Sequence, residues 1–445
     1  MTFPPSWRRD LDSRHWRILI ASLLGRLFDG YENFILFVLL APALRDLLTP
    51  EQLPDLTRYA GIILGVTVLG RSAGGLLVGV LADYVGRRRT LLMSYVLYAF
   101  STLISGLAPS WVLLGLARCI NGASLGGGLA LGATLIAEAW PTALRSRGQS
   151  WMQTAFGAGG LLANGLWFFL ASYTGDAGWR WPFFLSSIPA VLLVFFTHRN
   201  VPESEAWIEK NRERTELRTA EGSATPDAYT PGERAILGRF TLVALFAQKD
   251  LRRSLLLCIL MSFGTIGGYW AVSTWIPVYV ETVARAGGYT SMNWAALGGA
   301  VFSLGSIPGY LAGGYLAESW VGRRGMLAFY FTGSLVSIAA VYLWADAPLS
   351  LLIATFLHGF FTQGQFVWFA IYPPELFPTA VRGSAIATVF NVARGLSLLA
   401  PIFSGVLISQ FGGYSTMALT FGALYLLALV AVPFSAETRG KPLPH

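Results

Sequence analysis

The sequence predicts an all-α membrane protein in which twelve transmembrane helices form two pseudo-symmetric six-helix lobes. The first observation is composition: 54% of the 445 residues are hydrophobic and only 13% are charged, whereas charged residues make up about 25% of an ordinary globular protein. The second is that the apolar residues fall into runs long enough to cross a bilayer core. The third is an internal repeat. Together they exclude a soluble enzyme, a disordered chain and a disulfide-stabilised scaffold.

A transmembrane helix needs about 20 apolar residues, and twelve runs in the chain reach or approach this length. They cover residues 17–42, 59–82, 90–107, 111–139, 149–172, 181–197, 254–281, 293–317, 326–344, 349–373, 384–408 and 414–434. The charged N-terminal segment MTFPPSWRRDLDSRHW has no signal-peptide cleavage pattern. We therefore expect the first helix to remain in the mature protein.

Basic residues indicate how the helices are oriented. They crowd the N-terminal tail, the loops that follow even-numbered helices and the C-terminal tail, whereas the other loops hold only Arg45, Arg58, Arg180 and Arg285. The positive-inside rule then places both termini in the cytoplasm. The same asymmetry accounts for the net charge of +8, so the charge needs no nucleic-acid partner. The chain has no N-x-S/T acceptor, which fits a bacterial inner membrane, and we expect a monomer.

A long polar segment divides the helices into two sets of six. Residues 198–253 are rich in both acidic and basic side chains. Within them SEAWIEKNRERTEL is typical of a surface helix and GSATPDAYTPGE of a flexible joint. We therefore expect an N-terminal lobe at 1–197, a cytoplasmic linker with short helices at 198–253, and a C-terminal lobe with its tail at 254–445.

The two halves match at an offset near 235 residues. Glycines 70, 74 and 79 correspond to glycines 305, 309 and 314. Two charged boxes also recur, in which Asp83, Arg87, Glu138 and Arg145 correspond to Glu318, Arg323, Glu375 and Arg382. A duplicated six-helix unit around a polar joint is typical of a rocking transporter that binds its substrate between the lobes.

These motifs resemble those of the major facilitator superfamily. GVLADYVGRRR at 79–89 is similar to its signature loop, RCINGASLGGG at 118–128 to its fourth-helix signature, and GWR at 178–180 also fits. The run Asp29-Gly30-Tyr31-Glu32 resembles the D-G-F/Y-D of aromatic-acid, sialate and monocarboxylate:proton symporters, with Glu in place of the last Asp. The resemblance implies a secondary active transporter that works by alternating access and is not an enzyme.

The first helix carries Arg26, Asp29 and Glu32 in an apolar run. Spacing of three places neighbours side by side on a helix, so Arg26 can pair with Asp29. Adjacent carboxylates disfavour double ionisation, so one of them can hold a proton. The resemblance implies that Arg118 partners these acids and couples protonation to rocking. The alternatives are a structural ion pair and a packing role for Arg118. We expect Arg71 in the second helix to be mainly structural.

Arg394, with Asn391 one turn earlier, lies in the eleventh helix, where no acidic residue occurs between Glu375 and Glu437. An arginine in a membrane needs a partner, and a substrate carboxylate would match its planar guanidinium with two hydrogen bonds. The alternative is a cross-lobe pair with Asp29 or Glu32.

Other polar and aromatic side chains are candidates for a pocket wall. In the tenth helix the spacing predicts one face for His358, Phe361, Gln365 and Trp368. Gln153 and Asn164 share a face of the fifth helix, and the seventh contributes Tyr269 and Trp270. The charged boxes are expected to form a cytoplasmic gate that bridges the lobes, with Glu138 paired with Arg145, Glu375 paired with Arg382, and Asp83 and Glu318 near Arg87 and Arg323. Its predicted members are Asp83, Arg87, Glu138, Arg145, Glu318, Arg323, Glu375 and Arg382.

These observations favour a proton symporter of a small organic carboxylate, with protons and a lipid bilayer as its other partners. No Walker A pattern or metal-ligand cluster occurs, so we expect no metal and no cofactor. A sugar or polyol facilitator is the first alternative, because PESEAW and AETRG resemble segments of sugar porters. An organic-cation carrier that uses Asp29 and Glu32 as counter-charges is the second. A receptor or scaffold on the same fold is the third.

Overall fold

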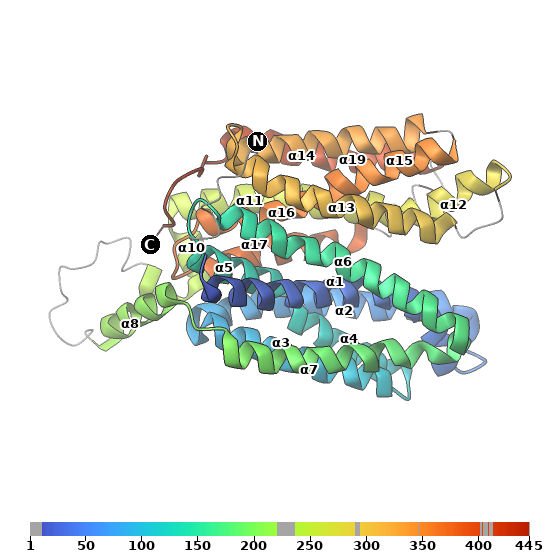
Figure 1. Ribbon diagram of the computed structural model, residues 1–445, viewed down its shortest axis with the longest axis horizontal. Coiled ribbons are helices and arrows are strands. Elements are labelled where there is room, and N and C mark those ends of the chain that lie inside the picture. Colours follow the sequence, from blue (N-terminus) through green and yellow to red (C-terminus); the bar gives the residue numbers. More distant parts are fainter. Residues whose placement is uncertain are drawn as a thin grey trace.

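The computed structural model describes residues 11–219, 236–289, 294–345, 347–400, 403, 408 and 413–444. Within these ranges the protein is all-α and contains no strand. Its long helices run roughly along one common direction, with α1 to α7 grouped in one half of the view and α11 to α20 in the other (Figure 1). This two-lobe arrangement confirms the predicted fold class.

The first lobe contains the six predicted helices, and most extend a few residues beyond their predicted ends. The predicted fourth helix is divided at Gly126–Gly127. The elements are α1 (Ser13–Leu47), η1 (Leu53–Asp55), α2 (Leu56–Val85), α3 (Arg87–Leu107), α4 (Trp111–Leu125), α5 (Gly128–Ala139), α6 (Arg145–Thr174), η2 (Gly175–Arg180) and α7 (Trp181–Asn200).

The second lobe is less regular, since several of its predicted helices contain short 3-10 or π turns. Its elements are α11 (Lys249–Val272), η4 (Ser273–Trp275), α12 (Ile276–Ala286), α13 (Trp294–Glu318), α14 (Gly322–Ala339), η5 (Ala340–Trp344), α15 (Pro348–His358), η6 (Gly359–Gln363), η7 (Gly364–Phe366), α16 (Val367–Ile371), η8 (Pro373–Glu375), α17 (Arg382–Leu396), η9 (Ser397–Leu399), α19 (Gly413–Gly422), α20 (Leu424–Ala431) and η10 (Val432–Phe434). Most of the predicted eleventh helix beyond residue 400 lies outside the described residues.

Two short helices lie between the lobes in the sequence. The predicted surface helix is present as α8 (Glu205–Thr219), and α10 (Thr241–Ala247) precedes the second lobe. The predicted joint GSATPDAYTPGE lies outside the described residues. Figure 1 shows α8 at one end of the bundle and α12 at the opposite end. We call these the linker end and the α12 end.

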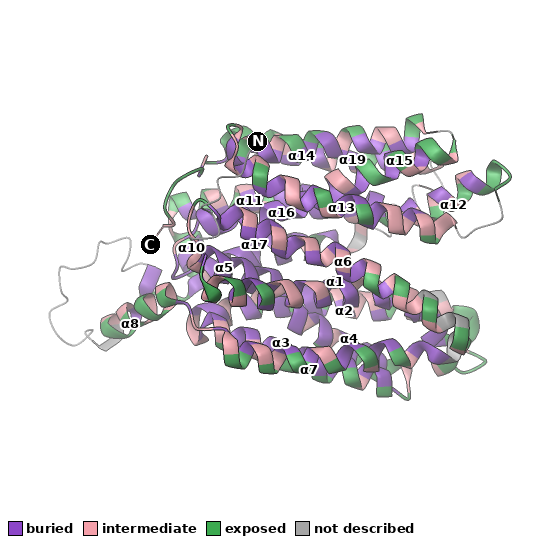
Figure 2. Cartoon of the chain, viewed as in Figure 1, coloured by how far each residue is buried: buried purple, intermediate pink, exposed green. Residues whose placement is uncertain are grey.

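Nine helices of the described chain are long and apolar enough to cross a membrane. The three other predicted spans correspond to α6, to the α15–α16 segment and to α17, which are more polar or interrupted. Exposed side chains alternate with buried ones along the outer helices (Figure 2). Many of these exposed side chains are large and apolar, including Leu77, Phe100 and Leu192. Such an apolar exterior suits a lipid environment, where only satisfied backbones are tolerated.

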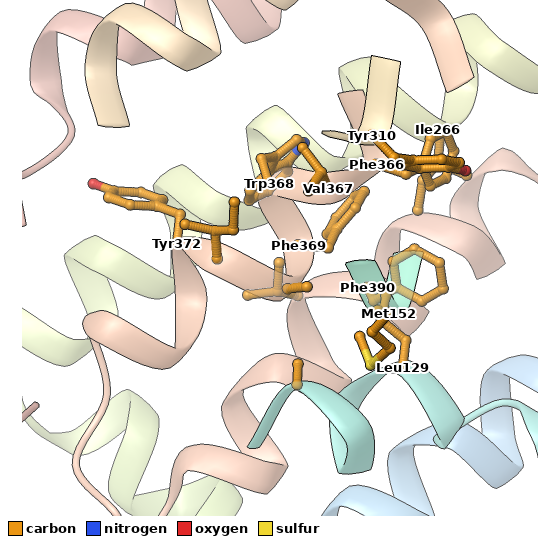
Figure 3. Packing of buried hydrophobic residues seen from close by; sticks show 14 of the residues in the cluster. Leu129, Met152, Ile266, Tyr310, Phe366, Val367, Trp368, Phe369, Tyr372 and Phe390 are labelled. Carbon is orange, nitrogen blue, oxygen red and sulfur yellow. The ribbon is translucent and has the colours of Figure 1, made fainter. Parts of the chain in front are cut away.

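The main hydrophobic core crosses the boundary between the lobes. It includes Leu129 and Met152 from the first lobe together with Phe366, Trp368 and Phe390 from the second. Figure 3 shows Phe390 and Met152 within this cluster, and the ring centre of Phe390 lies 4.7 Å from that of Phe369 and 6.3 Å from that of Phe366. The lobes are therefore packed against each other over part of their length.

Two helix pairs make the closest approach between the lobes, and each contains a glycine of the sequence repeat. A Cβ atom on Gly79 of α2 would lie 2.2 Å from Cβ of Ala387 on α17. A Cβ atom on Gly314 of α13 would lie 2.3 Å from Oγ of Ser150 on α6. Both positions thus require glycine, because a side chain would force the lobes apart.

We predict that Gly79→Val separates the lobes at the linker end. The added side chain cannot fit against Ala387, so a cysteine introduced at the buried Ala130 should react several-fold faster with a maleimide in a background lacking Cys119 and Cys258. Gly61→Val is the matched control on the same helix, because a Cβ atom there meets nothing within 4 Å. Equal reaction rates in the two variants would contradict the packing role of Gly79.

Candidate functional site

A cavity of about 390 Å³ lies between the lobes. The first lobe lines it with residues of α1, α2 and α6, and the second lobe with residues of α11, η4, α13, η6, η7, α17 and η9. Its polar and aromatic lining consists of Arg26, Glu32, Asn33, Phe37, Thr67, Arg71, Phe156, Tyr269, Trp270, Thr274, Tyr310, Gln363, Phe366, Phe390, Arg394 and Ser397. Since the α1 lining falls in the middle and later part of that helix, the cavity extends from mid-bundle toward the α12 end.

Asp29 is the centre of a first buried charge cluster. It forms a close ion pair with Arg26, as the spacing of three predicts. Its other carboxylate oxygen accepts from Nη1 of Arg71 at 2.9 Å. All three side chains are buried. Arg71 therefore neutralises Asp29 and lines the cavity, so the expectation of a mainly structural role for it was incomplete.

Glu32 belongs to a second cluster that faces away from the first. It pairs with Arg118, and its Oε1 accepts from the hydroxyls of Tyr98 at 3.3 Å and Thr102 at 3.2 Å. Nε of Arg118 donates to Oγ of Ser105 at 2.8 Å. The predicted contact between Arg118 and a carboxylate of the first helix is thus present. Asp29 and Glu32 nevertheless bind different arginines, so the structure does not join them as one acidic pair.

Arg394 lies on α17 at the cavity wall and is only partly buried. Its Nη1 donates to Oδ1 of Asn391 at 3.1 Å, and its guanidinium carbon lies 4.3 Å from the ring centre of Phe390. Among the described residues no carboxylate lies within the 4.0 Å of an ion pair. The alternative of a cross-lobe pair with Asp29 or Glu32 is therefore not realised in this conformation.

The predicted face of the tenth helix does not reach the cavity. His358 is fully buried between Oγ of Ser273 and Oγ of Ser337, at 3.0 Å from each. Gln365 donates to Oη of Tyr425, and Trp368 donates to Oγ1 of Thr265. Phe361 packs on another ring, that of Phe329. None of these four predicted residues lines the cavity.

The physical reason is a change of helical period. The π turn η6 adds a residue to one turn and the 3-10 turn η7 tightens the next, so a spacing of 3.6 fails across Gly359–Phe366. Gln363 and Phe366 face the cavity instead. Neither residue was predicted from the helical spacing in the sequence. Gly359 and Gly364, which begin the two irregular turns, are the one sequence signal that could have indicated a change of period here.

The other predicted pocket residues divide into two groups. Tyr269 and Trp270 line the cavity, and Trp270 meets Phe37 of the other lobe at 6.1 Å between ring centres. Nδ2 of Asn164 donates to the carbonyl of Gly160 on its own helix, and Asn164 is not among the cavity lining in the described chain. Phe156, Tyr310 and Phe390 complete the aromatic lining and were not singled out from the sequence.

Gln153 occupies a bridging position between the lobes. Its Oε1 accepts from Nε of Arg26 at 2.7 Å. Its Nε2 donates across the interface to the carbonyl of Phe366 at 2.8 Å. Gln153 thus connects the Asp29 cluster to the irregular turn that lines the cavity, rather than lining the cavity itself.

The charged boxes join the lobes at the linker end. Glu138 accepts from Arg87 of its own lobe at 3.1 Å and from Arg382 of the other lobe at 2.7 Å. Asp83 accepts from the backbone N–H groups of Gly383 and Ser384, at 3.0 and 2.8 Å. All these contacts are buried, so the linker end is closed.

The second set of boxes is only partly equivalent. Arg323 pairs with Glu375 at 2.7 Å and with Glu318 at 3.0 Å, and Oγ of Ser146 in the first lobe donates to Glu318 at 2.6 Å. In the described chain Arg145 meets no carboxylate within 4.0 Å, and its Nε and Nη1 lack partners. The expected pairs Glu138–Arg145 and Glu375–Arg382 are therefore wrong for this conformation. The packing of the lobes determines which arginine each acid pairs with, and the spacing within a box does not.

Two further segments, PES at 202–204 and Ala436–Thr438, make equivalent contacts in the two halves of the molecule. Glu203 accepts from the N–H groups of Arg87 and Arg88 at the start of α3, and Glu437 accepts from those of Arg323 and Arg324 at the start of α14. Burial raises the pKa of Glu437, but hydrogen bonds from these N–H groups outweigh burial and hold the pKa below its usual range. Both acids thereby stabilise a helix N-terminus.

Comparison with known proteins adds the following findings. The family model described as "Sugar (and other) transporter" matches residues 19–445. The niacin transporter NiaP of Acinetobacter baylyi is 25% identical over 438 residues, which cover 96% of this chain and 95% of the relative. The cis,cis-muconate transport protein of the same species is 28% identical over 447 residues, 98% of each chain.

Among solved structures, that of the major facilitator proton:xylose symporter XylE bound to 6-bromo-6-deoxy-D-glucose is similar in fold. Its TM-score is 0.77 at 20% identity, with 97% of this chain and 98% of that chain covered. At this identity the likeness shows the fold alone.

We predict that Arg382→Ala opens the linker end whereas Arg145→Ala has a smaller effect. Arg382 bonds Glu138 across the lobes, but its repeat counterpart Arg145 bonds no carboxylate in the described chain. Spin labels at the exposed Arg89 and Trp320, one in each lobe, would report the separation. We expect a longer-distance population in Arg382→Ala. An equal response in both variants would show that the cross-lobe bond does not hold this end closed.

Proposed function

The chain belongs to the sugar (and other) transporter family of the major facilitator superfamily, and from this premise we propose that it is a proton-coupled symporter of a small organic carboxylate. It is a multi-pass membrane transporter and not an enzyme. In the proposed mechanism Arg394 binds the carboxylate, Asp29 and Glu32 carry the proton, and Arg118 couples protonation to movement of the lobes. The observation that carries the proposal is Arg394, which lies at the wall of a mostly apolar cavity and has no carboxylate partner in the described chain.

The charge of the site supports an anionic substrate. The described part of the chain places Arg26, Arg71, Arg118 and Arg394 around Asp29 and Glu32. With both acids ionised, two positive charges are unmatched, and Arg394 holds one of them. A charge in a low-dielectric membrane interior is costly without a partner. A substrate carboxylate would supply that partner through a bidentate contact. The relatives named for niacin and muconate transport fit this class.

The surroundings of the two acids suggest different roles in proton transfer. Two guanidinium groups hold Asp29, so its protonation would break two ion pairs. Glu32 has one guanidinium partner and hydroxyls of Tyr98 and Thr102, which can rotate and accept from a protonated carboxyl. Glu32 is therefore the favoured site of proton exchange. Its protonation would release Arg118.

The contacts between the lobes suggest how protonation could be linked to their relative movement. We take residues 1–197 and 254–445 as the two moving units and residues 198–253 as their connection. Arg26, Gln153 and the Phe366 carbonyl form a path between the units. The distribution of basic residues favours a cytoplasmic linker end, in a bacterial inner membrane. The closed linker end and the cavity toward the α12 end then correspond to an outward-facing state.

A neutral sugar or polyol is the second candidate, favoured by the family description. In that case Arg394 would meet no substrate charge. An organic cation is less compatible still, because the cavity is lined by three arginines and a single glutamate in the described chain.

We predict that Arg394→Ala lowers the affinity for carboxylates roughly a hundredfold, the effect of losing a charge-assisted bidentate contact worth about 2–3 kcal/mol. Arg394→Lys should rescue binding only in part, because an ammonium cannot make the two-pronged contact. Binding of nicotinate, cis,cis-muconate and xylose to the purified protein would be measured by calorimetry. Arg285→Ala, an exposed arginine on α12, is the control. Unchanged carboxylate affinity in Arg394→Ala would place the sugar facilitator first.

We predict that Glu32→Gln abolishes uptake driven by a pH gradient but retains counterflow exchange, which needs no net proton movement. Asp29→Asn should also lose gradient-driven uptake, with weaker binding because Arg26 and Arg71 lose their shared partner. Both variants would be reconstituted in proteoliposomes. Gradient-driven accumulation at the wild-type level in both variants would contradict the assignment of the proton to these acids.

A further inference from the structure

Two buried polar side chains on the second-lobe wall of the cavity have no hydrogen-bond partner of good geometry in the described part of the chain. Gln363 is 1% exposed and Tyr310 is fully buried. Among the described residues, Oε1 and Nε2 of Gln363 and Oη of Tyr310 make no hydrogen bond of good geometry. Both residues line the cavity. Buried polar groups are nearly always satisfied, because an unmade hydrogen bond costs free energy. A ligand in the cavity would therefore be a natural partner for them.

The fold brings these two side chains together by an unusual backbone contact. Gln363 ends the π turn η6, and Tyr310 lies on α13. A Cβ atom on Gly364 would lie 2.7 Å from Cα of Gly309, so the two backbones touch at the residues next to Gln363 and Tyr310. This backbone contact places Gln363 and Tyr310 near each other at the cavity wall. π turns are rare and frequently lie at functional sites, and this one directs Gln363 into the cavity.

The surroundings indicate what kind of molecule would reach these groups. Tyr310, Gln363 and Arg394 line the same cavity. The uncharged pair and Arg394 are thus parts of one site. The rings of Phe156, Phe366 and Phe390 line the same space. Ring-lined walls suit a flat molecule.

We propose that Gln363 and Tyr310 form a second, uncharged subsite that hydrogen-bonds a polar atom on the body of the substrate. The preferred substrates are then flat carboxylates with a ring nitrogen or hydroxyl group away from the carboxylate. Gln363 offers an N–H donor and a carbonyl acceptor, and Tyr310 offers an O–H group, so either polar atom can be satisfied. This inference rests on the proposed function, in which Arg394 holds the carboxylate.

The test compares acids that differ in one polar atom. Benzoate, nicotinate and 3-hydroxybenzoate are titrated into the purified protein, and their dissociation constants are measured by calorimetry. We expect wild type to bind the two polar acids about 10- to 100-fold more tightly than benzoate, the effect of one buried hydrogen bond. Gln363→Leu and Tyr310→Phe should reduce that ratio while benzoate affinity stays within about threefold. Gln365→Leu is the matched control, because this neighbouring buried glutamine does not line the cavity.

Each outcome distinguishes the subsite from the proposed function. No preference in wild type, or the same preference in Gln363→Leu and Tyr310→Phe, overturns the subsite. Tyr310→Phe removes only the hydroxyl and keeps the ring, so it remains informative if Gln363→Leu does not fold. Arg394→Ala is measured with the same three acids. If it leaves their affinities unchanged, or if wild type binds none of them, the proposed function fails together with the subsite. If Arg394→Ala weakens all three but the ratio never depends on Gln363 or Tyr310, the subsite alone fails.

Discussion

An arginine inside a membrane protein must be matched by a negative charge or by a set of hydrogen bonds, and this constraint organises the middle of the molecule. Arg26 and Arg71 share Asp29, and Arg118 pairs with Glu32. Arg26, Arg71 and Arg394 all line the cavity, but of these four arginines only Arg394 has no carboxylate partner in the described chain, with an amide and an aromatic ring beside it. The other three arginines stabilise helix packing in the first lobe. Arg394 gives the cavity a positive charge that a ligand can neutralise.

The two ends of the bundle differ because their interlobe contacts differ. At the linker end, glycines bring backbones together and Glu138 receives guanidinium groups from both lobes. Toward the α12 end, the lobes are separated by the cavity, and Phe37 and Trp270 meet only ring to ring. Individual ion pairs contribute little when exposed, but these are buried and connected, so losing one member can shift the balance between states. Gln153 connects the two lobes to the charge cluster on α1, because it bonds both Arg26 and the carbonyl of Phe366.

Much of the fold could be predicted from the sequence, because apolar runs and glycine repeats act locally. The spacing of Arg26 and Asp29 predicted their contact, and the absence of acids near Arg394 predicted that it has no ion pair in its own helices. What failed depends on three-dimensional packing. The π turn at Gly359–Gln363 changes the helical period, so His358 and Gln365 point elsewhere and Gln363 takes their place. Likewise, the spacing within a box could not show that Glu138 pairs with Arg382 of the other lobe rather than with Arg145 of its own box.

In the proposed mechanism, the binding of a carboxylate at Arg394 and protonation of a first-lobe acid belong to one cycle. Calorimetry of nicotinate binding to wild type, in buffers with different heats of ionisation, measures directly whether protons are taken up with the ligand. We expect net proton uptake with each bound carboxylate at a pH where the acid is otherwise ionised, and loss of this uptake in Glu32→Gln. Tight carboxylate binding with no proton uptake at any pH would contradict the proposed mechanism.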